Sequence, residues 1–286
     1  MTVRIKEFFH SASSTYSYVV ADSGSGTAAI IDPVLDYDDK AGRTATSSAD
    51  EIIAYIRSSD LKLNWILETH AHADHLSSAQ YIKDELGGQV AIGQGIREVQ
   101  RTFRVVFNLG NDFPADGSHF DRLFADGDTF DLGCIVGRVM HTPGHTNDSV
   151  TYVIGDSAFI GDTMFMPDFG TARCDFPGGD ARKLYQSIKK ILALPSATGL
   201  YMCHDYAPGG RDYLFRTTVA EQKKANIHIH DGVGEDEFVV MREKRDRQLS
   251  VPNLIMPSIQ VNIRAGDTPP PEDNGVSYLK IPINAL

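Results

Sequence analysis

Residues 63–75 read LNWILETHAHADH, in which an apolar stretch runs directly into a cluster of imidazole and carboxylate side chains. The apolar part predicts a short buried strand that ends at the cluster. The cluster comprises His70, His72, Asp74 and His75, and both residue types are good ligands for first-row transition metals. Residues two apart on a helix face different directions, whereas a loop after a strand can turn them toward one point. The stretch therefore predicts a metal site at the end of a core strand.

Three more residues of the ligand type follow later predicted strands. His145 lies in HTPGHT, where Pro143 and Gly144 predict a tight turn. Asp162 lies in FIGDT, and His204 lies in MCHDY. Any one of these residues alone would usually be structural, but each follows a strand and comes after the histidine-rich cluster. The pattern predicts that they bind metal jointly with it.

The rest of the chain alternates between patterns of strand and helix. The predicted sheet segments include 16–22, 28–34, 63–70, 89–93, four runs between 128 and 163, and 198–206. The predicted helices are 49–59, 77–87 and 180–195. Residues 100–125 are less regular, and we interpret them as a segment able to carry a loop over a site. This order favours either two sheets with helices between and outside them or a layered α/β sandwich.

Composition narrows the class of protein. The net charge of −11 is spread along the sequence, which argues against a nucleic-acid surface because phosphate binding needs clustered Lys and Arg. Three cysteines, Cys134, Cys174 and Cys203, do not describe a disulfide scaffold. The N-terminal residues lack a signal-peptide pattern, and no run approaches the roughly 20 apolar residues of a membrane span. We therefore expect a soluble, cytoplasmic protein with no membrane partner.

The motifs together resemble the signature of the metallo-β-lactamase superfamily. HAHADH (70–75), GHT (144–146), GDT (161–163) and HDY (204–206) occur in the family's order, within roughly residues 1–225. The resemblance implies an αββα sandwich of two mixed sheets flanked by helices, with the site on the rim between the sheets. Residues 226–286 are then expected to be a C-terminal extension packed on the same domain. Its charged run MREKRDR (241–247) predicts a solvated helix face.

Within that superfamily the chain looks most similar to the persulfide dioxygenases. Arg173-Cys174-Asp175-Phe176 resembles their Arg-Thr-Asp-Phe element, with Cys174 in place of Thr, and HDY also matches. The stretches IDPVLDYDDKAGRT and PPPEDNG look like a bacterial subgroup of β-lactamase-like hydrolases. The resemblance implies a single Fe(II) per chain. Its ligands would be His70, His145 and Asp162.

Two histidines and one carboxylate leave positions on iron free for other ligands. The family's reaction uses O2 to oxidise glutathione persulfide to sulfite and glutathione, in sulfide detoxification. By this resemblance Arg173 and Arg211 are expected to pair with carboxylates of glutathione, and Tyr206 to donate a hydrogen bond near the metal. The family commonly forms dimers, so a homodimer is expected. The sequence assigns no role to His10 or Cys174.

Two other functions stay open. By residue count alone the chain fits a binuclear zinc hydrolase of the glyoxalase II type, acting on thioesters. The third class is a non-catalytic or sensory metal-binding module, against which the full ligand set weighs. In the binuclear alternative, one metal would take His70, His72 and His145, the other would take Asp74, His75 and His204, and Asp162 would bridge them.

Overall fold

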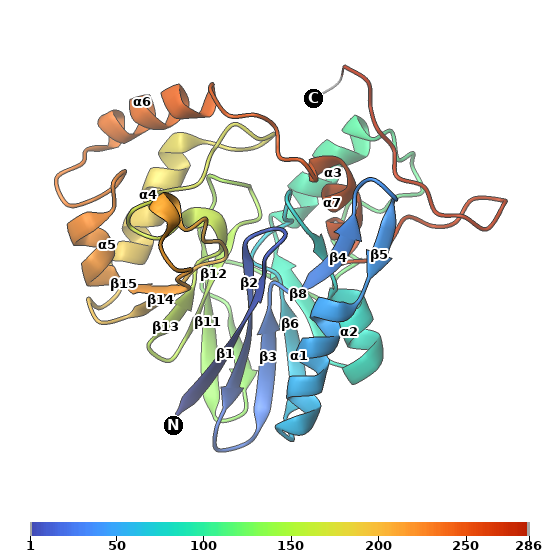
Figure 1. Ribbon diagram of the computed structural model, residues 1–286, viewed down its shortest axis with the longest axis horizontal. Helices are drawn as coiled ribbons and strands as arrows, with labels where there is room; N and C mark the ends of the chain where they lie inside the picture. Colours follow the sequence, from blue (N-terminus) through green and yellow to red (C-terminus); the bar gives the residue numbers. More distant parts are fainter. Residues whose placement is uncertain (1, 285–286) are drawn as a thin grey trace.

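The computed structural model describes residues 2–284, and its centre is formed by two six-stranded sheets that pack face to face (Figure 1). All but two of the strands lie before residue 163. In chain order the strands are β1 Val3–His10, β2 Thr15–Asp22, β3 Thr27–Ile31, β4 Val34–Asp38, β5 Arg43–Ala45, β6 Lys62–Leu67, β7 Leu76–Ser77, β8 Gln89–Gly93, β9 Arg122–Phe124, β10 Thr129–Leu132, β11 Ile135–His141, β12 Val150–Ile154, β13 Ser157–Phe159, β14 Gly199–Tyr201 and β15 Arg216–Thr218.

Seven α-helices and two short 3-10 turns connect or flank these strands within the described part of the chain. Helix α4 begins where the Asp180 side chain accepts hydrogen bonds from the backbone N–H groups of Arg182 and Lys183. The helices are α1 Ser47–Ser58, α2 Ala79–Leu86, α3 Ile96–Val106, α4 Ala181–Leu192, α5 Val219–Ala225, α6 Glu235–Asp246 and α7 Ile255–Asn262, and the 3-10 turns are η1 Gly161–Thr163 and η2 Pro208–Gly210.

Both sheets are mixed, as the sequence predicted. The first has the order β1-β2-β3-β6-β8-β9, in which the β1-β2-β3 part is antiparallel and the β3-β6-β8-β9 part is parallel. The second has the order β10-β11-β12-β13-β14-β15, with one parallel pair between β13 and β14. A small third sheet, β5-β4-β7, lies next to the loop that follows β6.

Three apolar layers hold the sheets and helices together. Side chains such as Tyr18, Leu67, Phe124 and Tyr152 fill the space between the two sheets. A second cluster packs the outer face of the first sheet against α1, α2, α3 and α7. A third packs the outer face of the second sheet against α4, α5 and α6. The order helix, sheet, sheet, helix confirms the predicted αββα sandwich.

The segment after residue 225 runs across one end of the sandwich. Figure 1 shows α6 above the second sheet and α7 beside the first, joined by a connecting segment without regular secondary structure. The Phe238 ring lies 5.7 Å from the ring of Tyr185 on α4, and Ile255 and Ile259 of α7 are buried in the first outer cluster. The C-terminal segment therefore contacts both halves of the fold.

Two expectations from the sequence differ from the structure. Part of the irregular segment 100–125 is helical, because α3 buries Val99 and Phe103 against the first sheet, and none of the segment lines the cavity described below. The charged run 241–247 is not wholly solvated, since Arg242 and Asp246 are buried and pair with each other. Their mutual neutralisation offsets the cost of burying them. No helix in residues 2–284 has the length and apolar character needed to cross a membrane.

Candidate metal centre

The candidate metal ligands come from loops at one end of both sheets. His70 follows β6 of the first sheet, whereas His145, Asp162 and His204 follow β11, β13 and β14 of the second. Two sharp turns aim these side chains. Gly144 has φ 136°, and a Cβ there would come within 2.3 Å of the Leu184 backbone nitrogen. Only glycine fits such a position, so the turn that presents His145 depends on it.

Asp162 is presented by a second turn of the same kind. Gly161 has φ 51°, and a Cβ there would lie 2.7 Å from the Thr69 hydroxyl oxygen. This close approach brings the GDT turn of the second sheet against the residue that precedes His70 in the first. The two sheets therefore meet at the metal ligands, on the rim of the sandwich.

His70, His145 and Asp162 form one compact triad. One potential ligand atom from each lies within 4.8 Å of those of the other two. The Oδ2 atom of Asp162 is 4.0 Å from the Nε2 atom of His70 and 3.7 Å from that of His145. These separations are too long for hydrogen bonds. They leave room for an ion between the three side chains.

Unpaired polar atoms indicate that the triad is built to hold such an ion. The Nε2 atom of His70 and the Oδ1 atom of Asp162 are buried and have no hydrogen-bond partner among the described residues. Burial and the neighbouring His72 lower the pKa of His70 well below its usual value. A neutral imidazole is the form that binds metal. The donor set of two imidazoles and one carboxylate fits a transition-metal cofactor.

The remaining four ligand-type residues form a second group. His72, Asp74, His75 and His204 also offer atoms that lie within 4.8 Å of one another. The Nε2 atom of His204 is 3.1 Å from Asp74 Oδ2 and 3.4 Å from Asp162 Oδ1, so this group adjoins the triad. His204 and His75 lower the pKa of Asp74 despite its burial. This lowered pKa favours the ionised carboxylate, which is the form that binds metal.

The position of His72 differs from the expected binuclear arrangement. The sequence grouped it with His70 and His145, but its Nε2 atom lies 3.0 Å from Oδ1 of Asp32, on the far side of the loop. Side chains two residues apart point the same way in a straight extended segment, but not where the backbone bends. His72 therefore clusters with the second group instead of the triad.

Two buried carboxylates fix the start of the HAHADH loop. Asp32 accepts hydrogen bonds from the backbone N–H and the hydroxyl of Thr69, and the same hydroxyl lies 3.0 Å from His70 Nδ1. Asp148 accepts a hydrogen bond from the backbone N–H of Ala71. Contacts of this kind fix the orientation of a ligand imidazole. Asp32 carried only a turn signal in the sequence, and Asp148 carried none.

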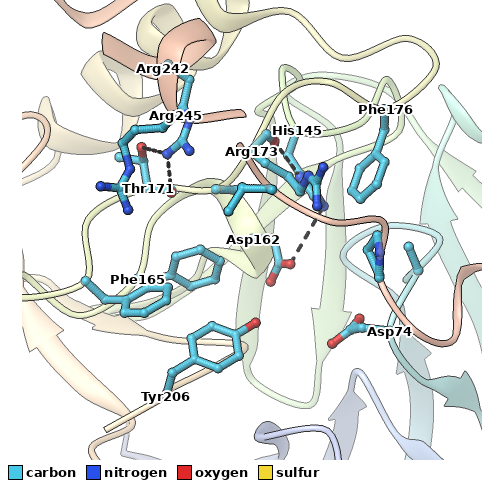
Figure 2. A pocket seen from close by; sticks show the side chains of 15 residues that line it. Asp74, His145, Asp162, Phe165, Thr171, Arg173, Phe176, Tyr206, Arg242 and Arg245 are labelled. Atoms are coloured by element: carbon cyan, nitrogen blue, oxygen red, sulfur yellow. Dashed lines mark hydrogen bonds and ion pairs between the residues drawn. The ribbon is translucent and has the colours of Figure 1, made fainter. Parts of the chain in front are cut away.

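A cavity of about 250 Å³ opens beside the triad. Asp74, His145 and Asp162 line one end of it, whereas His70 lies behind them. Figure 2 shows the carboxylates of Asp74 and Asp162 and the hydroxyl of Tyr206 facing a common space. The expected position of Tyr206 beside the metal centre agrees with this arrangement.

The walls of the cavity combine aromatic and cationic side chains. Phe165, Phe169 and Phe176 contribute apolar surface. Arg242 and Arg245 of α6 lie toward the end away from Asp74 (Figure 2). Arg242 pairs with Asp246, but Arg245 makes no ion pair within residues 2–284. The C-terminal segment thus supplies part of the site, although no motif in that segment predicted it.

The two arginines expected to bind substrate have other partners. Arg173 lines the cavity, but its guanidinium forms two hydrogen bonds with Asp175, at 2.6 and 2.7 Å, and lies 4.9 Å from the ring centre of Phe176. Its backbone carbonyl accepts a hydrogen bond from His145 Nδ1 at 2.8 Å. The Arg173 backbone therefore orients one of the candidate ligands.

Arg211 lies outside the residues that line the cavity. Its guanidinium contacts both Asp168 and Asp205, at 2.6 and 2.5 Å in the closest pairs. Fixed carboxylate partners already occupy its donors, which argues against the expected contact with a substrate carboxylate. The sequence could not reveal the pairing with Asp168, because Asp168 lies 43 residues away along the chain.

Cys174 and His10 also lie away from the triad. Cys174 is buried, and this burial raises the pKa of its thiol. His10 is hydrogen-bonded through Nδ1 to Ser13 and lies 3.4 Å from Asp36. Neither residue lines the cavity.

Comparison with known proteins agrees with this architecture. Residues 11–204 match the Metallo-beta-lactamase superfamily. A probable metallo-hydrolase of Burkholderia pseudomallei is 55% identical over 99% of both chains, and Glyoxylase B2 of Dictyostelium discoideum is 52% identical over 99% of this chain and 98% of that protein.

More distant relatives are named for a different chemistry. A mitochondrial persulfide dioxygenase of Bos taurus is 30% identical over 94% of this chain and 91% of that protein. The crystal structure of ETHE1 from Myxococcus xanthus superposes with a TM-score of 0.74 at 29% identity, covering 92% of this chain and all of that chain. The chain therefore belongs to the metallo-beta-lactamase superfamily, and its similarity to the persulfide dioxygenases extends over nearly its whole length.

Proposed function

We propose that this chain is a persulfide dioxygenase that holds a single Fe(II) between His70, His145 and Asp162. The observation that carries the proposal is the position of the triad beside the cavity. Two of its three side chains line the cavity, so an ion held by them keeps part of its surface accessible to small molecules. Two imidazoles and one carboxylate with open positions are the ligand set of non-haem iron oxygenases.

Iron, when bound, supplies redox chemistry that a zinc ion with its filled d shell cannot supply. The protein supplies position and surroundings. The Arg173 carbonyl orients His145, and the Thr69 hydroxyl, itself bound to Asp32, orients His70. The phenyl rings beside the triad exclude water from the space where a persulfide sulfur would lie. The hydroxyl of Tyr206 is available to donate a hydrogen bond there.

The proposed substrate is the persulfide of an acidic thiol carrier, glutathione by family resemblance. In the overall reaction, both atoms of O2 go to the outer sulfur, and water supplies the third oxygen of sulfite. The sulfur–sulfur bond breaks, and the carrier leaves as its thiol. Arg245 is the cavity-lining cation without an ion-pair partner among the described residues, so we assign it the contact with a carrier carboxylate.

Sequence similarity supports the same reaction. The Bos taurus relative at 30% identity and the Myxococcus xanthus structure at 29% are both similar along more than nine-tenths of this chain. Arg173 and Phe176, the two ends of the element that resembles the family's Arg-Thr-Asp-Phe, line the cavity.

An oxygen electrode combined with metal analysis tests the proposal. Protein purified from iron-supplemented cells should contain about one iron per chain and should consume O2 on addition of glutathione persulfide, with one sulfite formed per O2. About two zinc ions per chain, hydrolysis of S-lactoylglutathione and no oxygen uptake would contradict it.

The second candidate is a binuclear zinc hydrolase of the glyoxalase II type. It is favoured by the second group of ligand-type residues, which adjoins the triad through the 3.4 Å approach of His204 to Asp162. The 52% identity to a protein named Glyoxylase B2 also favours it. The same metal analysis separates the two candidates, because only this one requires two ions per chain.

A further inference from the structure

The side chain of Asn262, at the C-terminal end of helix α7, forms hydrogen bonds with the backbone of the HAHADH loop, called the metal loop below. Asn262 is 4% exposed. Its Oδ1 atom accepts a hydrogen bond from the backbone N–H of Ser77, and its Nδ2 atom donates to the backbone carbonyls of His72 and His75. All three bonds are 2.8 Å long. One amide thus binds three backbone groups of the HAHADH loop and the short strand that follows it.

These backbone groups have no regular secondary structure to pair with. Residues 71–75 contain neither helix nor strand, so their buried polar groups need partners from elsewhere. Asp148 binds the first of them, at Ala71. Asn262 binds the backbone carbonyls of His72 and His75, which lie on either side of Asp74. Asp32 and Asp148 therefore fix the start of the loop, and Asn262 of the C-terminal segment fixes the rest.

The approach of α7 to the loop is close and well supported. Ile255, Ile259 and Ile263 are buried in the cluster on the outer face of the first sheet, so the helix is held independently of Asn262. A Cβ at Gly266, which has φ 96°, would come within 2.9 Å of the Ser77 carbonyl oxygen. The glycine permits the chain to pass this near to the loop.

We propose that Asn262 is a positioning residue of the metal centre. Its hydrogen bonds go to backbone atoms only, and it acts by setting the backbone from which His72, Asp74 and His75 project. The C-terminal segment then has two roles: Asn262 positions the metal loop, and Arg242 and Arg245 line the cavity. The proposal goes beyond the proposed reaction, because it holds whether the protein binds iron or zinc.

The same helix offers a matched control. Gln260 is 1% exposed, and its side chain also makes three hydrogen bonds, donating to the carbonyls of Met256 and Lys280 and accepting from the Lys280 N–H. None of these partners belongs to the metal loop. Gln260→Ala therefore removes the same number of side-chain hydrogen bonds from α7 without changing a contact with the loop.

The test is the affinity of the metal-free protein for Zn²⁺, and for Fe²⁺ under anaerobic conditions, measured by competition with a chelator. Asn262→Ala should weaken both affinities by about tenfold or more, the usual effect of removing a group that orients a ligand. Asn262→Asp should do at least as much, because it keeps the contact with the Ser77 N–H but turns a carboxylate oxygen toward two carbonyl oxygens. Gln260→Ala should bind metal as the parent protein does.

Hydrogen exchange gives a readout that does not depend on metal. Backbone amides of residues 71–77 should exchange faster in the metal-free Asn262→Asp protein than in the parent or in Gln260→Ala. Unchanged metal affinity and unchanged exchange in a folded Asn262→Asp protein would overturn the proposal, as would an equal loss of affinity in Gln260→Ala. A protein without oxygen uptake would contradict the proposed reaction and leave this result intact.

Discussion

The two groups of ligand-type residues in this protein face different surroundings. In the triad of His70, His145 and Asp162, two of the three side chains line the cavity. In the second group only Asp74 does so, whereas His72, His75 and His204 are at most 1% exposed and lie behind it. A metal in the triad is accessible to a substrate, and one in the second group is reached past Asp74.

The two groups also differ in how their surroundings shift the pKa values of their histidines. Burial and neighbouring histidines lower the pKa of His70, which favours the neutral form that binds metal. Burial also opposes charge on His72, but the Asp32 carboxylate raises the pKa of His72 well above its usual value. The pKa values of two histidines separated by one residue in HAHADH are thus shifted in opposite directions. A ligand-type residue in the motif is therefore not necessarily a metal ligand.

Among the variants that test this difference between the two groups, removal of the triad carboxylate should have the largest effect on metal content and activity. Asp162→Ala takes away the only carboxylate of the triad and a neighbour of His204, so we expect loss of metal together with at least a hundredfold loss of oxygen-uptake activity. Metal analysis and the oxygen electrode on the same sample measure both. A variant that lost activity but retained its full metal content would show that the triad is not the binding site.

Removal of a cation from the cavity wall tests the accessible side of the triad. Arg245→Ala should raise KM for glutathione persulfide about tenfold with little change in kcat, because the lost contact lies away from the reacting sulfur. Lys244→Ala is the matched control, since it removes the same charge from the same helix but does not line this cavity. Equal kinetic effects of the two variants would indicate a general charge effect and not a binding contact.

The smallest expected change in metal content concerns the second group. If the centre is mononuclear, His204→Ala should retain most of the iron, because His204 does not belong to the triad. Metal content per folded chain, measured beside the parent protein and Asp162→Ala, gives the answer. Loss of half of the bound metal would favour a binuclear centre and would remove the distinction between the two groups.

Much of the fold could be predicted because the strands carry local patterns. The runs after residue 128 appear as β10 to β13, and the helix predicted over 180–195 appears as α4. The sequence did not predict β1, which pairs with β2 along its whole length, or the helical part of 100–125. Their residues acquire a buried face only from the strands and helices that pack on them, so the local pattern was ambiguous.

The site was predictable to the extent that it consists of motifs. All seven ligand-type residues were named, and the structure gathers them into two adjoining groups. No motif pointed to Asp148, Arg245 or Asn262, since each is a common residue outside the motifs. Arg211 was expected to pair with a substrate carboxylate because guanidinium matches carboxylate geometry, but in the structure Asp168 and Asp205 are its partners.

The sequence by itself determined the chemistry that is possible here, because imidazole and carboxylate side chains in four short motifs restrict the protein to metal binding on one known fold. The tertiary structure decided which of these groups face a cavity, which are turned toward Asp32, and which distant residues complete the wall and fix the loop. The physical reason is the range of the interactions. A turn or a strand end depends on neighbours along the chain, whereas the direction of a buried side chain depends on hydrogen bonds to partners such as Asn262, 187 residues beyond His75.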